Sequence, residues 1–114
     1  MMALKIFIKK EEVLNNMNFA NKVYELCKKI PRGKISSYKE IAHALNSKAY
    51  RAVGNALNKN PYKNVPCHRV VNSFGHLHGF ARGLKAKAEL LKKENIKIKN
   101  NKVLNFKEIL YRFK

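Results

Sequence analysis

The sequence predicts a small, mainly α-helical domain with a winged-helix-like helix-turn-helix and a short wing or hairpin. Apolar side chains recur at helical spacing in several segments, whereas strand-like alternation is confined to short stretches in the second half of the chain. Two of the helical segments are short and are joined by a tight turn, which is the pattern of a helix-turn-helix. Many helix pairs share this pattern, so it leaves other helical folds open. A chain of 114 residues is long enough for one domain, but not for two.

The first predicted helix has an apolar face at helical spacing, formed by Phe19, Val23, Leu26, Cys27 and Ile30. The run Pro31-Arg32-Gly33 closes this helix. Because Cys27 lies on the apolar face, we expect it to be a core thiol.

The helix-turn-helix is predicted between Ser37 and Pro61. Ser37 and Glu40 form the capping-box pattern and open a helix that continues to Leu45. Ser47, in the turn, is the N-cap expected for the second helix, which stops before Pro61. The inward face of the second helix is predicted to consist of Ala52, Val53, Ala56 and Leu57.

The last part of the chain predicts shorter elements. Residues 70–80 combine alternation with glycines, which predicts a short strand and a loop in the place of a wing. The next helix is amphipathic, with Leu84, Ala88 and Leu91 on its apolar face. Two short apolar runs flank Asn100-Asn101 and predict a hairpin, and residues 106–113 predict a short closing helix.

The composition predicts a polyanionic partner. The 25 Lys and Arg residues outnumber the 7 acidic residues, all of them Glu, and the formal net charge is +18. Such an imbalance opposes compaction through self-repulsion and favours binding to a polyanion. Nucleic acid is the first candidate and an anionic membrane surface the second; merely solvated charges are the alternative. Without Asp, a carboxylate-metal nuclease is disfavoured.

The sequence contains no pattern typical of a signal peptide or a membrane span, since the apolar stretch at residues 3–8 is short and contains Lys5. Two cysteines, Cys27 and Cys67, do not make a disulfide framework. A reactive thiol needs a reducing compartment, so the expected location is the cytoplasm. We expect a short N-terminal extension at residues 1–17 and one domain at residues 18–114.

The most informative run is Asn64-Val65-Pro66-Cys67-His68-Arg69-Val70-Val71. It places a thiol, a base and a permanent cation next to one another. A thiol is a strong nucleophile only as the thiolate, and a nearby base or positive charge draws off its proton. The alternative for an isolated Cys-His pair is a buried cysteine beside a surface histidine. A zinc site that also uses His76 and His78 is disfavoured because no pair has a zinc-finger spacing. A cysteine hydrolase is disfavoured because no oxyanion-hole motif is apparent.

Together with its flanking motifs, this run resembles the active-site signature of the O6-alkylguanine-DNA alkyltransferases. Residues 35–42 resemble the start of that family's helix-turn-helix, and residues 51–61 resemble its recognition helix and exit turn. Residues 79–84 and 90–94 resemble its substrate loop and its final helix. The resemblance covers roughly residues 18–98 in the same order. It implies direct-reversal DNA repair, in which the alkyl group of O6-alkylguanine in duplex DNA moves to a cysteine.

The resemblance assigns the chemistry to five residues. Cys67 is the alkyl acceptor, His68 takes its proton through a water, and Glu94 orients the histidine. Tyr38 donates a proton to N3 of the departing guanine, and Asn60 braces the turn before Cys67. The thioether product is not reversed by thiol exchange, so the resemblance implies a single-turnover methylated-DNA–protein-cysteine methyltransferase. Taken without the resemblance, Tyr38 is a packing residue, Glu94 a surface acid and Asn60 a helix C-cap.

The resemblance also assigns the DNA contacts. The alkyl carbon is inaccessible inside a duplex, so the nucleotide must be extruded. Arg51 matches the arginine that fills the space left by the flipped base, and its helix enters the minor groove, unlike the usual helix-turn-helix. The DNA-binding residues implied are Ser37, Ala49, Tyr50, Arg51, Ala52, Gly54 and Asn55. The residues implied for the substrate pocket are Pro66, Val70, Phe80 and Ala81.

The sequence departs from the family pattern at several points. Phe80 stands where the family usually has Tyr, and Tyr50 replaces a residue that is commonly small. The N-terminal domain of many members is expected to be missing or reduced here, and a structural zinc, where it occurs, belongs to that domain. We therefore expect a monomer with neither metal nor cofactor. A lesion sensor that binds damage without removing it is the alternative, although such relatives replace the reactive cysteine that is retained here as Cys67.

Overall fold

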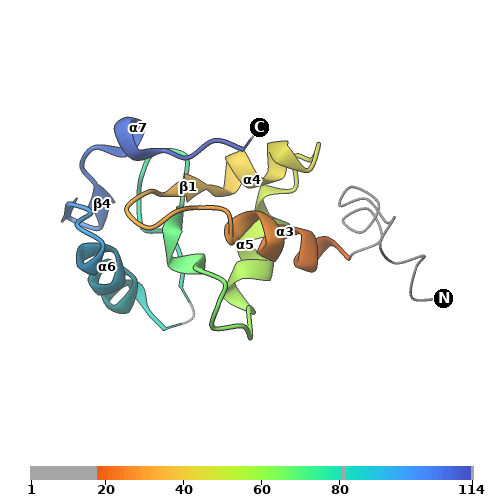
Figure 1. Cartoon of the computed structure of the whole chain (residues 1–114), viewed down its shortest axis with the longest axis horizontal. Coiled ribbons are helices and arrows are strands. Elements are labelled where there is room, and N and C mark those ends of the chain that lie inside the picture. Colours follow the sequence, from red (N-terminus) through yellow and green to blue (C-terminus); the bar gives the residue numbers. More distant parts are fainter. Residues whose placement is uncertain (1–17, 81, 114) are drawn as a thin grey trace, which may run out of the picture.

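The chain forms a cluster of helices at one end and a smaller helix-and-hairpin unit at the other (Figure 1). The structure is a computed structural model that describes residues 18–80 and 82–113, so the expected N-terminal extension lies outside it. The elements in chain order are α3 (Phe19–Cys27), β1 (Ser36–Ser37), α4 (Tyr38–Ala44), α5 (Tyr50–Asn58), the 3-10 helix η1 (Cys67–Arg69), β2 (Val70–Val71), α6 (Leu84–Lys93), β3 (Ile98–Lys99), β4 (Lys102–Val103) and α7 (Phe106–Ile109). The predicted mainly helical fold class is confirmed.

Helix α3 packs against α4 and α5 and begins at a side-chain cap, where Asn18 accepts a hydrogen bond from the N–H of Asn21 at 2.8 Å. Cys27 is fully buried, as predicted. The helix ends at Cys27, earlier than the apolar spacing predicted. Ile30 is nevertheless fully buried, because a tight turn follows in which the Ile30 N–H donates to the Cys27 carbonyl at 3.1 Å.

Helices α4 and α5 form the predicted helix-turn-helix. Ser37 caps α4, since its hydroxyl accepts a hydrogen bond from the N–H of Glu40 at 3.1 Å. The predicted start of α5 was wrong: Ala49 is the N-cap, and the Ser47 hydroxyl accepts from the Ala49 N–H at 2.9 Å within the turn. The Ser47 side chain is therefore engaged before the helix begins. Ala52 is exposed rather than inward-facing.

Two short parallel strands hold the segment that follows Cys67 beside the segment that precedes α4. Strand β1 pairs with β2, with Ser36 opposite Val70 and Ser37 opposite Val71. Tyr38 directly follows β1, whereas Cys67 lies three residues before β2, so the two residues lie beyond opposite ends of the parallel strand pair. Both nevertheless line one pocket. The C-terminal segment closes the other side of β1, where the Tyr111 N–H donates to the Ile35 carbonyl at 2.7 Å.

The predicted hairpin is confirmed as β3 and β4, which pair in antiparallel fashion. Asn100 and Asn101 have φ angles of 52° and 58°, the left-handed conformation that a two-residue hairpin turn requires and asparagine tolerates. The stretch predicted as a wing contains only the two-residue strand β2 and continues as a loop. This loop is attached to the hairpin, since the Leu77 N–H donates to the Asn101 carbonyl at 2.8 Å.

The closing helix is the short α7, which packs against the loop between β2 and α6. Gly75 in this loop has a φ of +88°, and an added Cβ would lie 3.1 Å from Phe106 Cβ. Glycine is therefore required at this position both by backbone conformation and by space. Within residues 18–80 and 82–113, no helix has the length and apolarity needed to cross a bilayer.

Candidate active site

Cys67 begins η1 and is partly buried between α5, β2 and the loop that precedes α6. The segment before it is braced by Asn60, whose amide oxygen accepts from the Tyr62 N–H at 2.9 Å. The Asn60 amide nitrogen donates to the Tyr62 carbonyl at 3.0 Å and lies 3.8 Å from the Cys67 sulfur. Asn60 therefore holds the turn and also presents a donor to the thiol.

A buried acid lies behind the nucleophile. The Glu94 carboxylate, at the C-cap of α6, lies 2.7 Å from His68 Nε2. Arg69 donates to the same carboxylate from Nε at 2.9 Å and from Nη2 at 3.0 Å, and the Gly33 N–H donates at 3.2 Å. Glu94 is only 7% exposed, so these donors replace the water it loses.

The protonation states of this cluster follow from its contacts. Burial by itself raises the pKa of Glu94, but the hydrogen bonds from Arg69 and His68 and from the backbone outweigh burial and lower the pKa to about 2. Burial also lowers the pKa of His68 below its ordinary value, and Glu94 offsets this only in part. At neutral pH the pair is therefore a carboxylate and a neutral imidazole.

The neutral imidazole of His68 is oriented to act as a base. Because Nε2 faces the Glu94 carboxylate, we assign the ring proton to Nε2, which leaves the Nδ1 lone pair free. No direct hydrogen bond joins His68 to Cys67 in the described part of the chain. A bridging water is the arrangement by which Nδ1 would reach the thiol.

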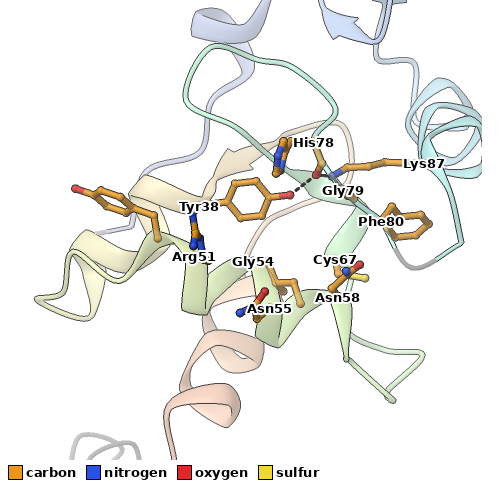
Figure 2. Close-up of a pocket in the computed structure, with 12 residues that line it drawn as sticks. Tyr38, Arg51, Gly54, Asn55, Asn58, Cys67, His78, Gly79, Phe80 and Lys87 are labelled. Carbon is orange, nitrogen blue, oxygen red and sulfur yellow. Dashed lines mark hydrogen bonds between the residues drawn. The ribbon is translucent and has the colours of Figure 1, made fainter.

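A pocket of about 160 Å³ opens on the other side of Cys67 (Figure 2). It is lined by Tyr38 from α4, by Gly54 and other residues of α5, and by the loop residues His78 and Phe80. The Tyr38 hydroxyl points into the pocket and donates a hydrogen bond to the His78 carbonyl (Figure 2). Burial, together with the negative charge of a Cys67 thiolate, raises the pKa of Tyr38 to about 12, so Tyr38 is a proton donor at neutral pH.

A second hollow, of about 570 Å³, also reaches Cys67. Its lining includes Asn60, Pro66, His68, Phe80 and Arg82. Leu57, Cys67 and Phe80 line both hollows, so Cys67 is reached from each of them.

The outer surface of α5 carries most of the residues assigned to DNA. Arg51, Ala52 and Asn55 are exposed, and Ala49 is exposed at the N-cap. Tyr50 is 39% exposed, and its hydroxyl lies 3.1 Å from His43 Nε2 of α4. The inner side of α5 contributes Val53, Ala56 and Leu57 to the core. This helix therefore has one face for packing and one free for a ligand.

Three assigned residues lie elsewhere than expected or cannot be placed. Ser37 is only 2% exposed, and its hydroxyl is used as the cap of α4, so its side chain is not available as a DNA contact. Val70 is fully buried in the core and does not line the pocket beside Cys67, because β2 turns its side chain inward. Ala81 lies outside the described residues.

Sequence reasoning missed two residues of this site, Arg69 and Lys87. Arg69 was considered only as a nearby cation, yet it forms a bidentate contact with Glu94. Lys87 is 1% exposed and lines the pocket beside Cys67. A signal existed for it, since Lys87 lies between Leu84 and Leu91 at helical spacing on the apolar face of α6. In residues 18–80 and 82–113, no three His, Cys, Asp or Glu side chains gather as a metal site would require.

Comparison with known proteins decides the family. The family model for the DNA-binding domain of 6-O-methylguanine DNA methyltransferase matches residues 18–96, which is more than half of the chain. The chain belongs to this family. A methylated-DNA–protein-cysteine methyltransferase of Methanosarcina barkeri is 46% identical over 79 residues, which are 68% of this chain and 50% of the relative. The chain thus spans about half the length of the curated relatives that it matches.

Solved structures agree with the family assignment. The structure of Schizosaccharomyces pombe Atl1 in complex with damaged DNA containing O6-carboxymethylguanine has a TM-score of 0.74 at 30% identity. That match covers 93% of this chain and 100% of the other. Mycobacterium tuberculosis OGT in complex with DNA has a TM-score of 0.65 at 40% identity, covering 69% of this chain and 50% of the other. The alkyltransferase-family fold predicted from the sequence motifs is confirmed.

Proposed function

We propose that this chain removes alkyl groups from O6 of guanine in duplex DNA by transferring them to Cys67. The observation that carries the proposal is the position of Cys67, between a buried Glu94-His68 pair and a pocket that contains a tyrosine hydroxyl. A nucleophile, a base with an orienting acid and a proton donor then lie around one small pocket. These are the groups needed to displace a base from an alkyl carbon.

The proposed reaction has two proton movements and one carbon transfer, followed by a proton exchange with solvent that restores Tyr38 and His68. The Cys67 proton passes through a water to Nδ1 of His68, and Glu94 stabilises the imidazolium that forms. The thiolate attacks the alkyl carbon, so that a sulfur–carbon bond forms as the carbon–O6 bond breaks. The Tyr38 hydroxyl donates a proton to N3 of the departing guanine. The imidazolium of His68 then loses its proton to solvent and the Tyr38 oxygen regains one. The products are guanine in the DNA and a thioether on Cys67, which supports a single turnover.

Tyr38 must change partner for this reaction. Its hydroxyl now donates to the His78 carbonyl, so the guanine N3 would take the place of that carbonyl. His78 also accepts a hydrogen bond from Lys87 at 3.1 Å, and its carbonyl therefore keeps a donor when Tyr38 turns to the substrate. The exchange would leave no buried carbonyl unpaired.

DNA binding is proposed for the exposed face of α5. Arg51 projects from the first turn of this helix and lines the mouth of the pocket, so it can enter the space that an extruded nucleotide leaves. Ala52 and Ala49 present little bulk, which favours close approach to the minor groove. The net charge of +18 supports contacts to phosphates that do not depend on sequence.

The proposal carries expectations about the state of the protein. Cys67 must remain a free thiol, which favours a reducing compartment such as the cytoplasm. The proposed reaction uses protein side chains and a water only, so it requires no cofactor. One chain contains all the groups named, which is consistent with action as a monomer.

A second candidate function is damage binding without transfer. It is favoured by the likeness to Atl1, which extends over the whole of that chain in a complex with damaged DNA. The presence of Cys67 beside the Glu94-His68 pair favours transfer instead. The two functions differ in whether the protein gains mass.

Intact-mass measurement after incubation with duplex DNA that contains O6-methylguanine tests the proposal. We expect one methyl group per chain, mapped to Cys67, and no further turnover. Cys67→Ser should bind the duplex without gaining mass. Cys27→Ser is the matched control and should react normally, because burial raises the pKa of the Cys27 thiol to about 12 and keeps it unreactive. Tight binding of the damaged duplex without any gain in mass would favour the second candidate.

A further inference from the structure

Lys87 is a buried cation that has no role in the reaction steps proposed above. It lies on α6, is 1% exposed, and is the largest fully buried side chain among the described residues. A lysine is rarely buried to this extent unless its charge is paired or fully hydrogen-bonded. No carboxylate among the described residues pairs with it, since the described ion pairs involve only Glu25 and Glu94.

Backbone carbonyls take the place of water around the Lys87 ammonium. Its Nζ donates to the Val70 carbonyl at 2.6 Å, to the His78 carbonyl at 3.1 Å and to the Gly79 carbonyl at 3.1 Å. An ammonium has three donors, so all of them are used. Two aromatic rings add to this cage, since Nζ lies 5.9 Å from the ring centre of Tyr38 and 6.0 Å from that of Phe80 (Figure 2).

The cage borders the pocket that Cys67 lines. Val70 is three residues after Cys67 and immediately follows η1, and His78, Gly79, Phe80 and Lys87 line the same pocket as Cys67. Every one of the three acceptors is a neutral carbonyl. The net charge of the cage is therefore positive, and it faces a group that must become negative to react.

The charges of Lys87 and Cys67 act on each other. Burial lowers the pKa of Lys87 to about 8, while negative charge on the Cys67 sulfur acts in the opposite direction. Of the other titratable groups near the ammonium, Tyr38, Cys27 and His68 are neutral at pH 7. The pocket that Lys87 lines also contains Tyr50, His78 and the cation Arg51. Electrostatic coupling is reciprocal, so a thiolate that favours the ammonium is favoured by it to the same extent.

We propose that Lys87 is a positioning residue of the active site, whose caged ammonium supplies the fixed positive charge that favours the thiolate form of Cys67. The role of Lys87 in alkyl transfer rests on the function proposed above. The charge coupling between Lys87 and Cys67 does not depend on DNA. His68 would remove the proton, and Lys87 would stabilise the anion left behind. The neutral thioether product no longer balances the ammonium, so the coupling ends when the alkyl group has been transferred.

The test is the pH dependence of Cys67 modification by iodoacetamide, a small reagent that requires neither DNA nor base flipping. Lys87→Met removes the charge and the donors, and Lys87→Gln removes the charge while keeping an N–H donor. We expect both variants to react about three- to tenfold more slowly than wild type at pH 7. Their rates should approach that of wild type at high pH, where the thiol is ionised without assistance.

Lys85→Met is the matched control, because Lys85 is exposed two residues earlier on the same helix. It removes one charge from the protein and should change the rate by less than about twofold, since exposed charges are screened. A purely structural role for Lys87 predicts a loss at every pH, including the plateau, or no change in rate. Either result in a Lys87→Gln protein that retains its far-ultraviolet circular dichroism overturns the proposal.

A measurement on the unaltered Lys87 covers the case in which neither variant folds. NMR titration of the lysine Cε resonances would give the pH at which Lys87 loses its proton in wild type and in Cys67→Ser. Serine has nearly the same size as cysteine but stays neutral. We expect Lys87 to titrate at a lower pH in Cys67→Ser, and identical titrations would overturn the proposal. Neither the iodoacetamide rates nor the Lys87 titration involves DNA. A failure of alkyl transfer from DNA would therefore count only against the proposed function.

Discussion

The two sides of Cys67 are built in different ways. On the side of α6, Glu94 is held by His68, Arg69 and the Gly33 backbone, with heavy-atom distances between 2.7 and 3.2 Å. On the side of α5, the pocket contains the Tyr38 hydroxyl, whose partner is a carbonyl of a loop. The first side is a hydrogen-bonded network around the ion pair of Glu94 and Arg69, whereas the second is an open pocket with a hydrogen bond that can be exchanged.

In the proposed reaction, this difference separates preparation of the Cys67 nucleophile from binding of the alkylated guanine. Breaking a buried charge network is costly because a charge is left without its partner. Exchanging one neutral hydrogen bond for another costs little, since a typical net contribution is about 1 kcal/mol. The Glu94 side is thus suited to stay unchanged during the reaction, and the Tyr38 side is suited to open for the substrate.

The largest expected effect comes from Glu94→Gln. This change keeps the shape of the side chain but leaves the partly buried Arg69 without a charged partner. The single amide oxygen of the glutamine cannot serve both Arg69 and His68 as the carboxylate does. We expect alkyl transfer to slow by about 10²-fold and the free energy of unfolding to fall by about 3 kcal/mol. Single-turnover kinetics and urea denaturation measure the two effects. Glu89→Gln, on the exposed face of the same helix, is the matched control and should be close to wild type in both.

The acid dependence of stability sharpens the same prediction. Glu94 has a pKa of about 2 in the folded protein, below its ordinary value of 4.5. Its contribution to stability is therefore complete above about pH 4.5 and is lost as the pH falls towards 2. The lowered pKa of His68 acts in the same direction below its ordinary value of 6.5. Urea midpoints should fall between about pH 6 and 3 in wild type and less steeply in Glu94→Gln; parallel curves would contradict the network described.

Tyr38→Phe tests the exchangeable side and is expected to separate rate from stability. The ring remains in place against Gly54, and the His78 carbonyl keeps its hydrogen bond from Lys87. We therefore expect the free energy of unfolding to change by less than about 1 kcal/mol, while transfer slows by about 10- to 10²-fold because the proton donor is lost. Tyr62→Phe is the control, since Tyr62 is 52% exposed. A Tyr38→Phe protein that reacts at the wild-type rate would remove Tyr38 from the chemistry.

The smallest expected effect concerns Arg51, which lies on α5 at the mouth of the pocket. Arg51→Ala should slow repair of duplex DNA by about tenfold more than reaction with free O6-benzylguanine, because only the duplex requires extrusion of a nucleotide. Competition between the two substrates in one reaction gives this ratio directly. Lys48→Ala, which removes an exposed charge just before the helix, should not change the ratio. Equal losses on both substrates would place Arg51 in the pocket or in the fold instead.

Local features of the fold could be read from short segments of the chain. Ser37 and Glu40 specify a helix start because the cap is formed within one turn, and the hydrogen bond of 3.1 Å is present. Asn100-Asn101 specify the hairpin because the required left-handed conformation is a property of the two residues themselves. The Cys67 motif likewise predicts a reactive thiol from its immediate neighbours, and this stays a prediction. In each case the physical cause acts over a few residues.

The arrangement around Cys67 depends on partners that are far apart in the chain. Glu94 receives hydrogen bonds from Arg69, 25 residues earlier, and from Gly33, 61 residues earlier. Lys87 is charged and lies in a helix with several lysines, so residue type alone predicts an exposed side chain. Packing instead surrounds its ammonium with three carbonyls from two other segments. Ser37 shows the converse, because the pairing of β1 with β2 buries a hydroxyl that the motif placed at the DNA surface. A side chain's type sets what it can bond to, but burial and the parallel pairing of distant strands set which partner it meets.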